Sequence, residues 1–213
     1  MRKAVLHLKK SDPTMRAIIE KHGPCRIVYG EPCFASLAET IVYQQLHGNA
    51  AAAIFKRFAD MAGRPLLPEG VLKLSDEQMR SAGLSKQKVS YLRSLAELTL
   101  SGALNFEQLP NLPNEEVIAH LTQVRGIGLW SSQMFLMFTL RRPDILPTGD
   151  LGIQIAMQKH YRNRKLPKPA EMEKIAKAWA PYRTYACWYL WKTVDTKAEK
   201  EVSKSPKKTK RVS

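Results

Sequence analysis

Signals for the starts and ends of helices recur along this 213-residue chain, and signals for strands do not. Asp12 and Pro13 combine an N-cap residue with a first-turn proline, and Gly23 is typical of a helix end. Ser75 and Gln78 form a capping box before a second, short helix. Apolar residues spaced three and four apart predict further helices over residues 34–45, 50–62, 85–101, 114–122, 130–140, 151–161, 171–179 and 182–191. The sequence therefore predicts an all-α fold without internal repeats.

The length of the chain suits one sizeable core, or two lobes that share a cleft. The three cysteines, Cys25, Cys33 and Cys187, have no spacing typical of metal ligands, which favours a reduced intracellular protein without structural zinc or a four-cysteine iron–sulfur cluster. Residues 1–10 lack the apolar core of a signal peptide, and no later apolar run approaches membrane-spanning length. We expect a soluble monomer with no membrane partner.

The formal net charge of +15 is large for a chain of this size. From Asp195 onward seven lysine and arginine residues oppose three acids, a net charge of +4, which leaves +11 on residues 1–194. A basic folded body suits a polyanion, most commonly nucleic acid, although ribosomal and membrane-surface proteins share this bias. We expect one folded domain of two helical lobes over residues 1–194 and a disordered basic tail over 195–213. The tail is either a nuclear-import signal or a solvated run of charge, so we expect nuclear location in a eukaryote and cytoplasmic location otherwise.

The segment 124–130, with Gly126, Ile127 and Gly128 at its centre, is typical of a phosphate-binding hairpin between two helices. Two residues without a Cβ let the backbone turn tightly and approach a ligand. The amides that follow can hold a phosphate oxygen at a helix N-terminus. The same pattern also occurs as an ordinary turn between packed helices, so the segment alone leaves both readings open.

Two further positions stand out along the chain. Asp150 occupies the N-cap position of the helix expected from Leu151, where it either only satisfies backbone amides or acts as a catalytic carboxylate. A break around Gly48 leaves residues 44–47 at the mouth of a turn between two helices, where polar and apolar tips can project together. The alternative for this break is a simple loop that buries Leu46.

The order and spacing of these segments resemble the helix-hairpin-helix (HhH-GPD) DNA glycosylase superfamily, and within it the 3-methyladenine DNA glycosylase II, or alkylbase glycosylase, branch. The resemblance covers about residues 34–191 and is carried by residues 41–46, 83–88 with 91–92 and 95–96, 126–131, 150–153 and 179–186, ending in Trp191. It implies a two-lobed helical fold with a DNA-binding cleft between the lobes. It also implies release of alkylated purines from damaged double-stranded DNA, as the first step of base excision repair.

The resemblance assigns roles to individual residues. Asp150 resembles the essential aspartate, whose charge stabilises the oxocarbenium-like sugar and helps to place the attacking water without a metal or other cofactor. Gln45, Leu46 and His47 resemble the wedge that fills the gap left by an everted nucleotide in kinked DNA. Tyr43, Trp130 and Tyr182 resemble pocket aromatics, whose ring faces attract a cationic purine.

The resemblance also implies contacts made by the hairpin. The residues expected to contact DNA are Arg125, Gly126, Ile127, Gly128, Trp130 and Ser131. The main-chain carbonyls of Thr122, Val124 and Ile127 are expected to hold a structural Na⁺ or K⁺. Relatives that cleave DNA through a Schiff base carry a lysine two residues after the second hairpin glycine. The residue here is Trp130, which cannot form an imine, so we expect no abasic-site lyase activity.

Two departures from the family pattern leave more than one function open. Gly149 stands where many members of the branch have a second acid, and Leu129 stands where a basic residue is common. The first hypothesis is a monofunctional alkylpurine glycosylase that uses Asp150. The second is a catalytically weak or inactive relative that recognises and protects abasic sites or distorted DNA. A third is a general basic DNA-binding module in which Asp150 is only structural.

Overall fold

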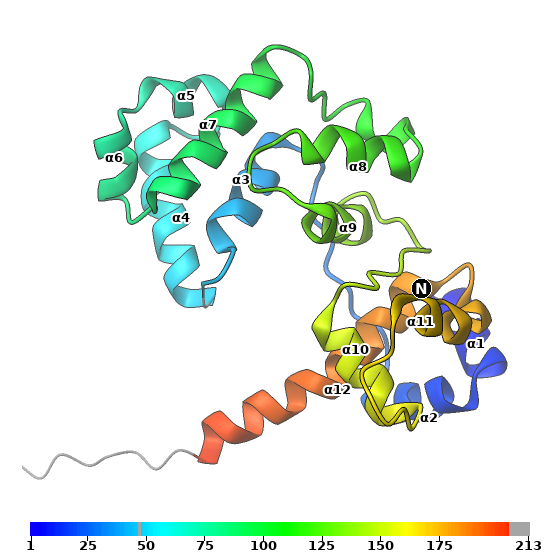
Figure 1. Ribbon diagram of the computed structural model, residues 1–213. Coiled ribbons are helices and arrows are strands. Elements are labelled where there is room, and N and C mark those ends of the chain that lie inside the picture. The colour runs from blue at the N-terminus through cyan, green and yellow to red at the C-terminus, as the bar shows by residue number, and fades with distance from the viewer. Residues whose placement is uncertain (47, 205–213) are drawn as a thin grey trace, which may run out of the picture. The chain divides into compact units, whose positions relative to one another are not determined.

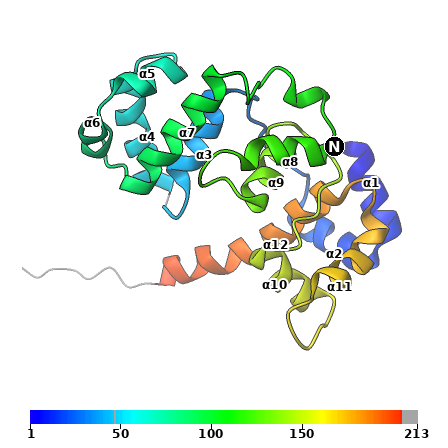
Figure 2. The same cartoon turned by 45° about the horizontal axis from the view of Figure 1, so that its top comes forward.

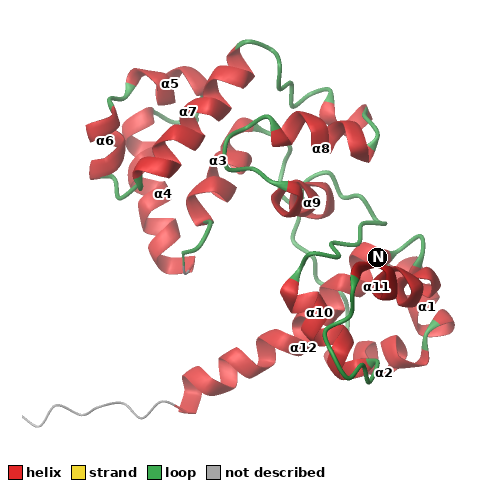
Figure 3. Cartoon of the chain, viewed as in Figure 1, coloured by secondary structure: helices red, strands yellow, loops and turns green. Residues whose placement is uncertain are grey.

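The computed structural model describes residues 1–46 and 48–204, with side chains described as far as residue 194. Within these ranges every regular element is a helix, which confirms the all-α prediction (Figure 3). No described helix is long and apolar enough to cross a membrane. The α-helices are α1 (Arg2–Ser11), α2 (Pro13–His22), α3 (Phe34–Tyr43), α4 (Gly48–Ala62), α5 (Pro68–Lys73), α6 (Asp76–Ser81), α7 (Lys86–Leu100), α8 (Asn114–Thr122), α9 (Leu129–Phe138), α10 (Leu151–His160), α11 (Pro169–Ala176) and α12 (Arg183–Lys204). Two short 3-10 helices are η1 (Leu109–Asn111) and η2 (Lys177–Trp179).

The chain folds into two compact units, and the cleft expected between lobes stays a prediction. The central unit is Val28–Arg142, and the discontinuous unit combines Met1–Ile27 with the chain from Pro143 onward. In the central unit α7 packs against α3, α5 and α6, and α8 packs against α9 (Figures 1 and 2). Leu37, Ile41 and Leu92 are fully buried in its core. This core fixes the C-terminal end of α3 and the N-terminal end of α7. These two ends hold the segment around residue 45.

The discontinuous unit is built around α12, which packs against α1, α2 and α10. Trp179 and Tyr189 are its largest fully buried side chains. Asp12 caps α2 by accepting a hydrogen bond from the Met15 amide at 3.0 Å. Its other carboxylate oxygen accepts from the Tyr161 hydroxyl at 2.6 Å and from Trp179 Nε1 at 2.8 Å. One buried carboxylate thus ties the start of α2 to the end of α10 and to η2.

The last helix continues past the boundary expected after residue 194, because α12 extends to Lys204. Residues 196–204 contain alanine, glutamate and lysine, which favour helix, so the helix can continue beyond the last apolar contacts. The rest of the expected tail, residues 205–213, lies outside the described residues.

Candidate nucleic-acid interface and carboxylate site

The two glycines of the hairpin between α8 and α9 have different structural roles. Gly126 has φ 80°, and a Cβ at this position would overlap the ring of Tyr91. Gly128 has φ −104°, and a Cβ there would meet no heavy atom within 4 Å. Gly126 is therefore required by the packing of the central unit. Gly128 is not required by that packing, and it leaves the backbone open to a ligand at the start of α9.

The start of α9 provides the groups expected at a phosphate site. Amides in the first turn of a helix lack intrahelical partners and carry partial positive charge. The amide and hydroxyl of Ser132 both donate to the Gly128 carbonyl at 3.0 Å, which closes the first turn. Arg125 is exposed, and its amide donates to Ser94 Oγ at 3.2 Å. Ile127 and Ser131 are buried, whereas Trp130 is 48% exposed, so its indole can meet a ligand.

The wedge segment, residues 44–46 as the structure describes it, begins where α3 ends at Tyr43. Lys88 Nζ donates to the carbonyls of Val42 at 2.6 Å and Gln44 at 2.9 Å, so an ammonium group caps the C-terminus of α3. The helix ends two residues before the expected end because Gln44 takes an extended conformation, with ψ 129°, and Gln45 follows with φ 56°. The alternative of a loop with buried Leu46 is wrong, because Leu46 is 40% exposed. His47 lies outside the described residues.

One pocket of about 1030 Å³ in the central unit joins the wedge segment to the hairpin. Gln44 Nε2 donates to the Gly126 carbonyl at 3.0 Å and links the two directly. The lining residues are Ser36, Glu39, Thr40, Tyr43, Gln44, Gln45, Leu46, Ser85, Gln87, Lys88, Tyr91, Gly126, Trp130, Ser131 and Met134. Burial and then the charge of Glu39 raise the pKa of Tyr43. The predicted residues Tyr43, Gln45, Leu46, Gly126, Trp130 and Ser131 thus share one pocket.

Asp150 belongs to the discontinuous unit, at the N-cap of α10. Its Oδ1 accepts from the Ile153 amide at 2.8 Å and from Trp191 Nε1 at 2.9 Å, and the residue is 8% exposed. A Cβ on Gly152 would lie 3.1 Å from that oxygen and 3.2 Å from Trp191 Cδ1. Glycine at position 152 therefore lets the indole approach the carboxylate. A Cβ on Gly149 would meet no heavy atom within 4 Å, so the missing second acid is not excluded by space.

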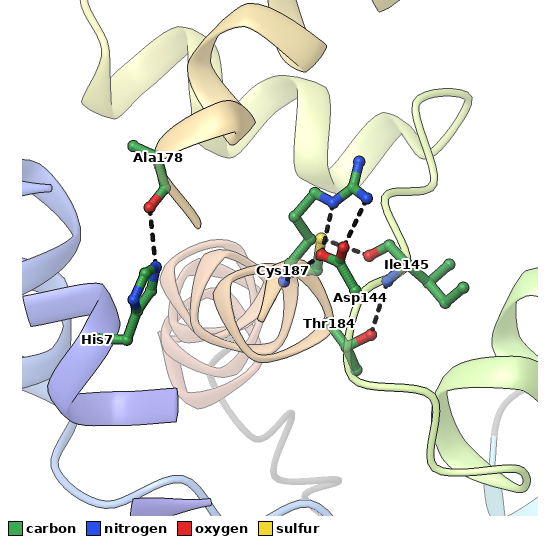
Figure 4. A network of polar contacts seen from close by, with 7 residues as sticks. His7, Asp144, Ile145, Ala178, Thr184 and Cys187 are labelled. Carbon is green, nitrogen blue, oxygen red and sulfur yellow. Dashed lines mark hydrogen bonds and ion pairs between the residues drawn. The ribbon is translucent and has the colours of Figure 1, made fainter. Parts of the chain in front are cut away.

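A second polar network holds the chain segment that precedes Asp150 (Figure 4). Asp144 accepts from Arg183 Nε at 2.6 Å and Nη2 at 2.7 Å, and also from the Arg183 amide at 3.2 Å. The Ile145 amide donates to the Thr184 hydroxyl at 3.1 Å. Burial, and next the charge of Asp150, raise the pKa of the Cys187 thiol well above its usual range. This network fastens the segment before Asp150 to the first turn of α12.

Tyr182 lies in the discontinuous unit, whereas Tyr43 and Trp130 lie in the central unit. Its ring makes edge contacts with His7 at 5.3 Å and with Tyr185 at 6.2 Å between centroids. His7 is itself held by a hydrogen bond of 3.3 Å to the Ala178 carbonyl (Figure 4). The role of Tyr182 as a pocket aromatic stays a prediction.

The carbonyls expected to hold a monovalent ion lie around the end of α8. Thr122 is its last residue, and carbonyls at a helix C-terminus carry partial negative charge. The Val124 carbonyl accepts the Ile127 amide at 3.0 Å, which leaves its second lone pair for a further partner. These carbonyl oxygens fit Na⁺ or K⁺ in donor chemistry.

Comparison with known proteins identifies the family. A family model described as the HhH-GPD superfamily of base excision DNA repair proteins matches residues 38–181. The chain belongs to the HhH-GPD superfamily. It is 38% identical over 197 residues to DNA-3-methyladenine glycosylase 1 of Schizosaccharomyces pombe, covering 90% of this chain and 86% of that protein. The matched residues span the wedge segment, the hairpin and Asp150.

Solved structures resemble the HhH-GPD chain over most of its length. A DNA-3-methyladenine glycosidase from Bacillus halodurans has a TM-score of 0.82 and 39% identity, covering 92% of this chain and 91% of its own. The Schizosaccharomyces pombe 3-methyladenine DNA glycosylase in complex with abasic DNA has a TM-score of 0.77 and 38% identity, covering 91% and 97%.

Four residues that shape these sites have no role that sequence reasoning alone assigns. Lys88 and Tyr91 lie in a segment that resembles the family, but no role was predicted for either. Trp191 was recognised only as the end of the resemblance. Glu39 was not singled out, and its signal was its position one turn before Tyr43 on an amphipathic helix.

Proposed function

We propose that this protein is a monofunctional DNA glycosylase that releases alkylated purines from damaged double-stranded DNA in base excision repair. The observation that carries the proposal is the buried Asp150 carboxylate, fixed by two donors, in a chain 38% identical to a protein named as a DNA-3-methyladenine glycosylase. A relative solved in complex with abasic DNA supports DNA as the partner. We also propose a nuclear location if the source is a eukaryote.

In the proposed reaction the bond between the sugar and the purine nitrogen breaks, and its electron pair leaves with the base. A cationic alkylated purine thereby departs as a neutral base, and positive charge develops on the sugar. The Asp150 carboxylate stabilises that charge more strongly than it stabilises the ground state. Water then adds to the sugar carbon and loses a proton, which leaves an abasic site. Trp130 has no amine that could form an imine, so the DNA strand stays intact.

The pocket of the central unit supports recognition of a cationic base. Tyr43 and Trp130 line it, and aromatic faces attract cations by about 0.5–2 kcal/mol. Glu39 adds a carboxylate beside Tyr43. We propose that Glu39→Gln lowers excision of cationic alkylated purines more than excision of neutral modified purines. Equal loss on both substrates would remove Glu39 from base selection.

We propose that the wedge segment and the hairpin contact different parts of the DNA. Leu46 and His47 enter the base stack at a weakened pair, while the α9 amides, Arg125 and a monovalent ion at the α8 carbonyls hold the phosphate backbone. Replacing Leu46 and His47 together by alanine should weaken affinity for an abasic-site duplex far more than for intact duplex. An alanine double mutant with wild-type preference for the abasic duplex would contradict this assignment.

A second candidate function is recognition and protection of abasic or distorted DNA without excision. Gly149 and Leu129 favour it, because the chain lacks a second acid and a phosphate-facing cation at these positions. Parallel assays of the wild-type protein separate the candidates. Base release from methylated duplex supports the glycosylase. Tight binding to an abasic duplex without base release from any alkylated substrate supports the recognition protein.

A further inference from the structure

A cationic pocket in the discontinuous unit has no part in the proposed excision chemistry. It has a volume of about 330 Å³ and lies where the C-terminal ends of α2 and α10 meet one face of α12. Its lining residues are Thr14, Ala17, Ile18, Lys21, His22, Lys159, His160 and Thr193. The lining thus contains two lysines, two imidazoles and two hydroxyls, and no acid.

The positive charge of the folded chain is concentrated in the same unit. Residues 1–27 and 143–194 contain sixteen lysine and arginine residues against six acids, whereas residues 28–142 contain eleven against ten. Two acids near the pocket in sequence are occupied elsewhere. Glu20 pairs with Lys9 at 2.8 Å, and Asp12 accepts from Tyr161 and Trp179. The pocket therefore lies in a positive field without an internal counter-ion among its lining residues.

The cations of this pocket destabilise one another. Burial lowers the pKa of His22, followed by the charges of Lys21, Lys192 and Lys159. Burial also lowers the pKa of His160, followed by the charges of Lys159, Lys21 and His22. A single cation at a helix C-terminus is favourable, but here two helix ends bring their basic residues together. An anion in the pocket would relieve this repulsion.

One imidazole also has an unmet hydrogen-bonding requirement. His160 Nε2 is buried and has no hydrogen-bond partner among the described residues. A buried polar group without a partner is unfavourable, so when Nε2 carries a proton an acceptor in the pocket would be favourable. When protonated, each imidazole has only donors to offer, and lysine likewise only donates. The chemistry of the lining is that of a donor set for an oxyanion.

We propose that this pocket binds a phosphate-type oxyanion, held by Lys21, Lys159 and the two imidazoles of His22 and His160. The ligand is either free phosphate or a phosphate of the DNA backbone. The site is independent of the proposed glycosylase activity. Binding of the anion is coupled to proton uptake by the imidazoles, so affinity rises as pH falls. The positive charge of the unit and the unpartnered Nε2 of His160 both favour a ligand that is negatively charged and accepts hydrogen bonds.

The test uses sulfate as the probe, because sulfate keeps its two charges across the pH range in which histidine titrates. Imidazole proton signals of the full chain are followed by NMR during titration with sulfate, against chloride at matched ionic strength. We expect saturable shifts of the His22 and His160 signals, tighter binding at pH 6 than at pH 8, and unchanged signals of His7 and His120. Signals that shift without saturation, or that shift equally at all histidines, would mean an adventitious ion only and would overturn the proposal.

Charge variants make the test specific to the pocket. Lys21→Gln with Lys159→Gln should weaken sulfate binding about tenfold, because it removes both lysine charges of the pocket. Lys3→Gln with Lys174→Gln is the control, since it removes the same charge from exposed positions of the same unit outside the pocket. Equal weakening by both double variants would contradict a built site. Circular dichroism checks that both variants keep the helical fold.

A DNA arm distinguishes the two sources of the ligand. Sulfate is titrated into the complex with intact duplex DNA. If the duplex shifts the His22 and His160 signals and competes with sulfate, the natural ligand is a backbone phosphate. If sulfate binds the complex as it binds the free protein, the natural ligand is a free phosphate. Failure of base release leaves this test unaffected, so the two proposals fail separately.

Discussion

Asp150 combines two roles that the sequence presents as alternatives. The carboxylate caps α10 through the Ile153 amide, and the same oxygen accepts the Trp191 indole N–H. Two donors on one oxygen fix the orientation of the carboxylate before any substrate arrives. A carboxylate held in this way needs little reorganisation when positive charge develops beside it. Capping therefore positions the group that we propose for catalysis.

Substitution of Trp191 should separate the positioning of the Asp150 carboxylate from the binding of DNA. Trp191→Phe keeps an aromatic ring and removes the hydrogen bond to Asp150, so we expect kcat to fall about tenfold, or about 1.4 kcal/mol, with KM nearly unchanged. Trp188→Phe is the matched control on α12, because Trp188 packs on Tyr189 and Lys192 instead. Single-turnover rates measure the effect. A similar loss in both variants would contradict a positioning role for Trp191.

The hairpin between α8 and α9 offers a matched pair of substitutions at the scale of one element. Gly126→Ala should lower the free energy of unfolding by about 2–4 kcal/mol, because a Cβ overlaps Tyr91 and φ is positive. Gly128→Ala should change stability by less than about 0.5 kcal/mol, since the space around it is open. Its DNA affinity should nonetheless fall if a phosphate approaches this backbone. Urea unfolding and DNA titration measure the two quantities, and equal destabilisation by both variants would be evidence against this division.

The first turn of α12 should give a pH-dependent contribution to stability. Hydrogen bonds from Arg183 lower the pKa of Asp144 against the effect of burial. A carboxyl whose pKa is lower in the folded state adds stability above its unfolded pKa and loses it as pH falls through the folded value. Asp144→Asn should therefore cost about 1 kcal/mol at pH 7, allowing for solvent screening, and progressively less as pH falls through the lowered folded pKa of Asp144. Thermal unfolding across pH tests this, and a constant difference between the two proteins would contradict it.

Local sequence patterns predict the helices well where a short motif of a few residues marks a helix cap or a helix break. Asp12, Ser75 and Asp150 each cap the helix that they were predicted to cap. The sequence did not predict α1 or α5, because α1 has no side-chain cap and buries only Ala4 and Leu8, and α5 has six residues. Lys88 could not be recognised as the cap of α3, because it lies more than forty residues from the carbonyls that it binds. Contacts of this kind depend on tertiary packing, which no local pattern records.

The same distinction applies to the candidate site. The hairpin and the wedge segment are continuous in sequence, so the glycines of the hairpin and the helix break at the wedge segment are enough to predict them. The indole of Trp191 reaches Asp150 across forty-one residues, and Tyr91 reaches Gly126 across thirty-five. These supporting residues are visible only once α7 and α12 are packed in their units.

The charge of the whole molecule should govern affinity for DNA in general rather than preference for damage. With +15 on the chain, affinity for duplex DNA should fall steeply between low and physiological salt, by roughly 10³-fold if about six phosphates are contacted. Truncation after Asp195 removes seven lysine and arginine residues and should weaken binding to intact duplex. Preference for an abasic duplex over an intact duplex should stay nearly constant, because phosphate contacts carry no lesion information. Equal loss of affinity and preference would contradict this separation.

The most direct test of the proposed function is base release by Asp150→Asn. The substitution keeps the size and much of the capping capacity of the side chain and removes its charge, which is needed mainly in the transition state. We expect the single-turnover rate of alkylated purine release from methylated duplex to fall by about 10²–10³-fold, with affinity for an abasic duplex within about twofold of wild type. Excision by Asp150→Asn at the wild-type rate would contradict the assignment of this carboxylate.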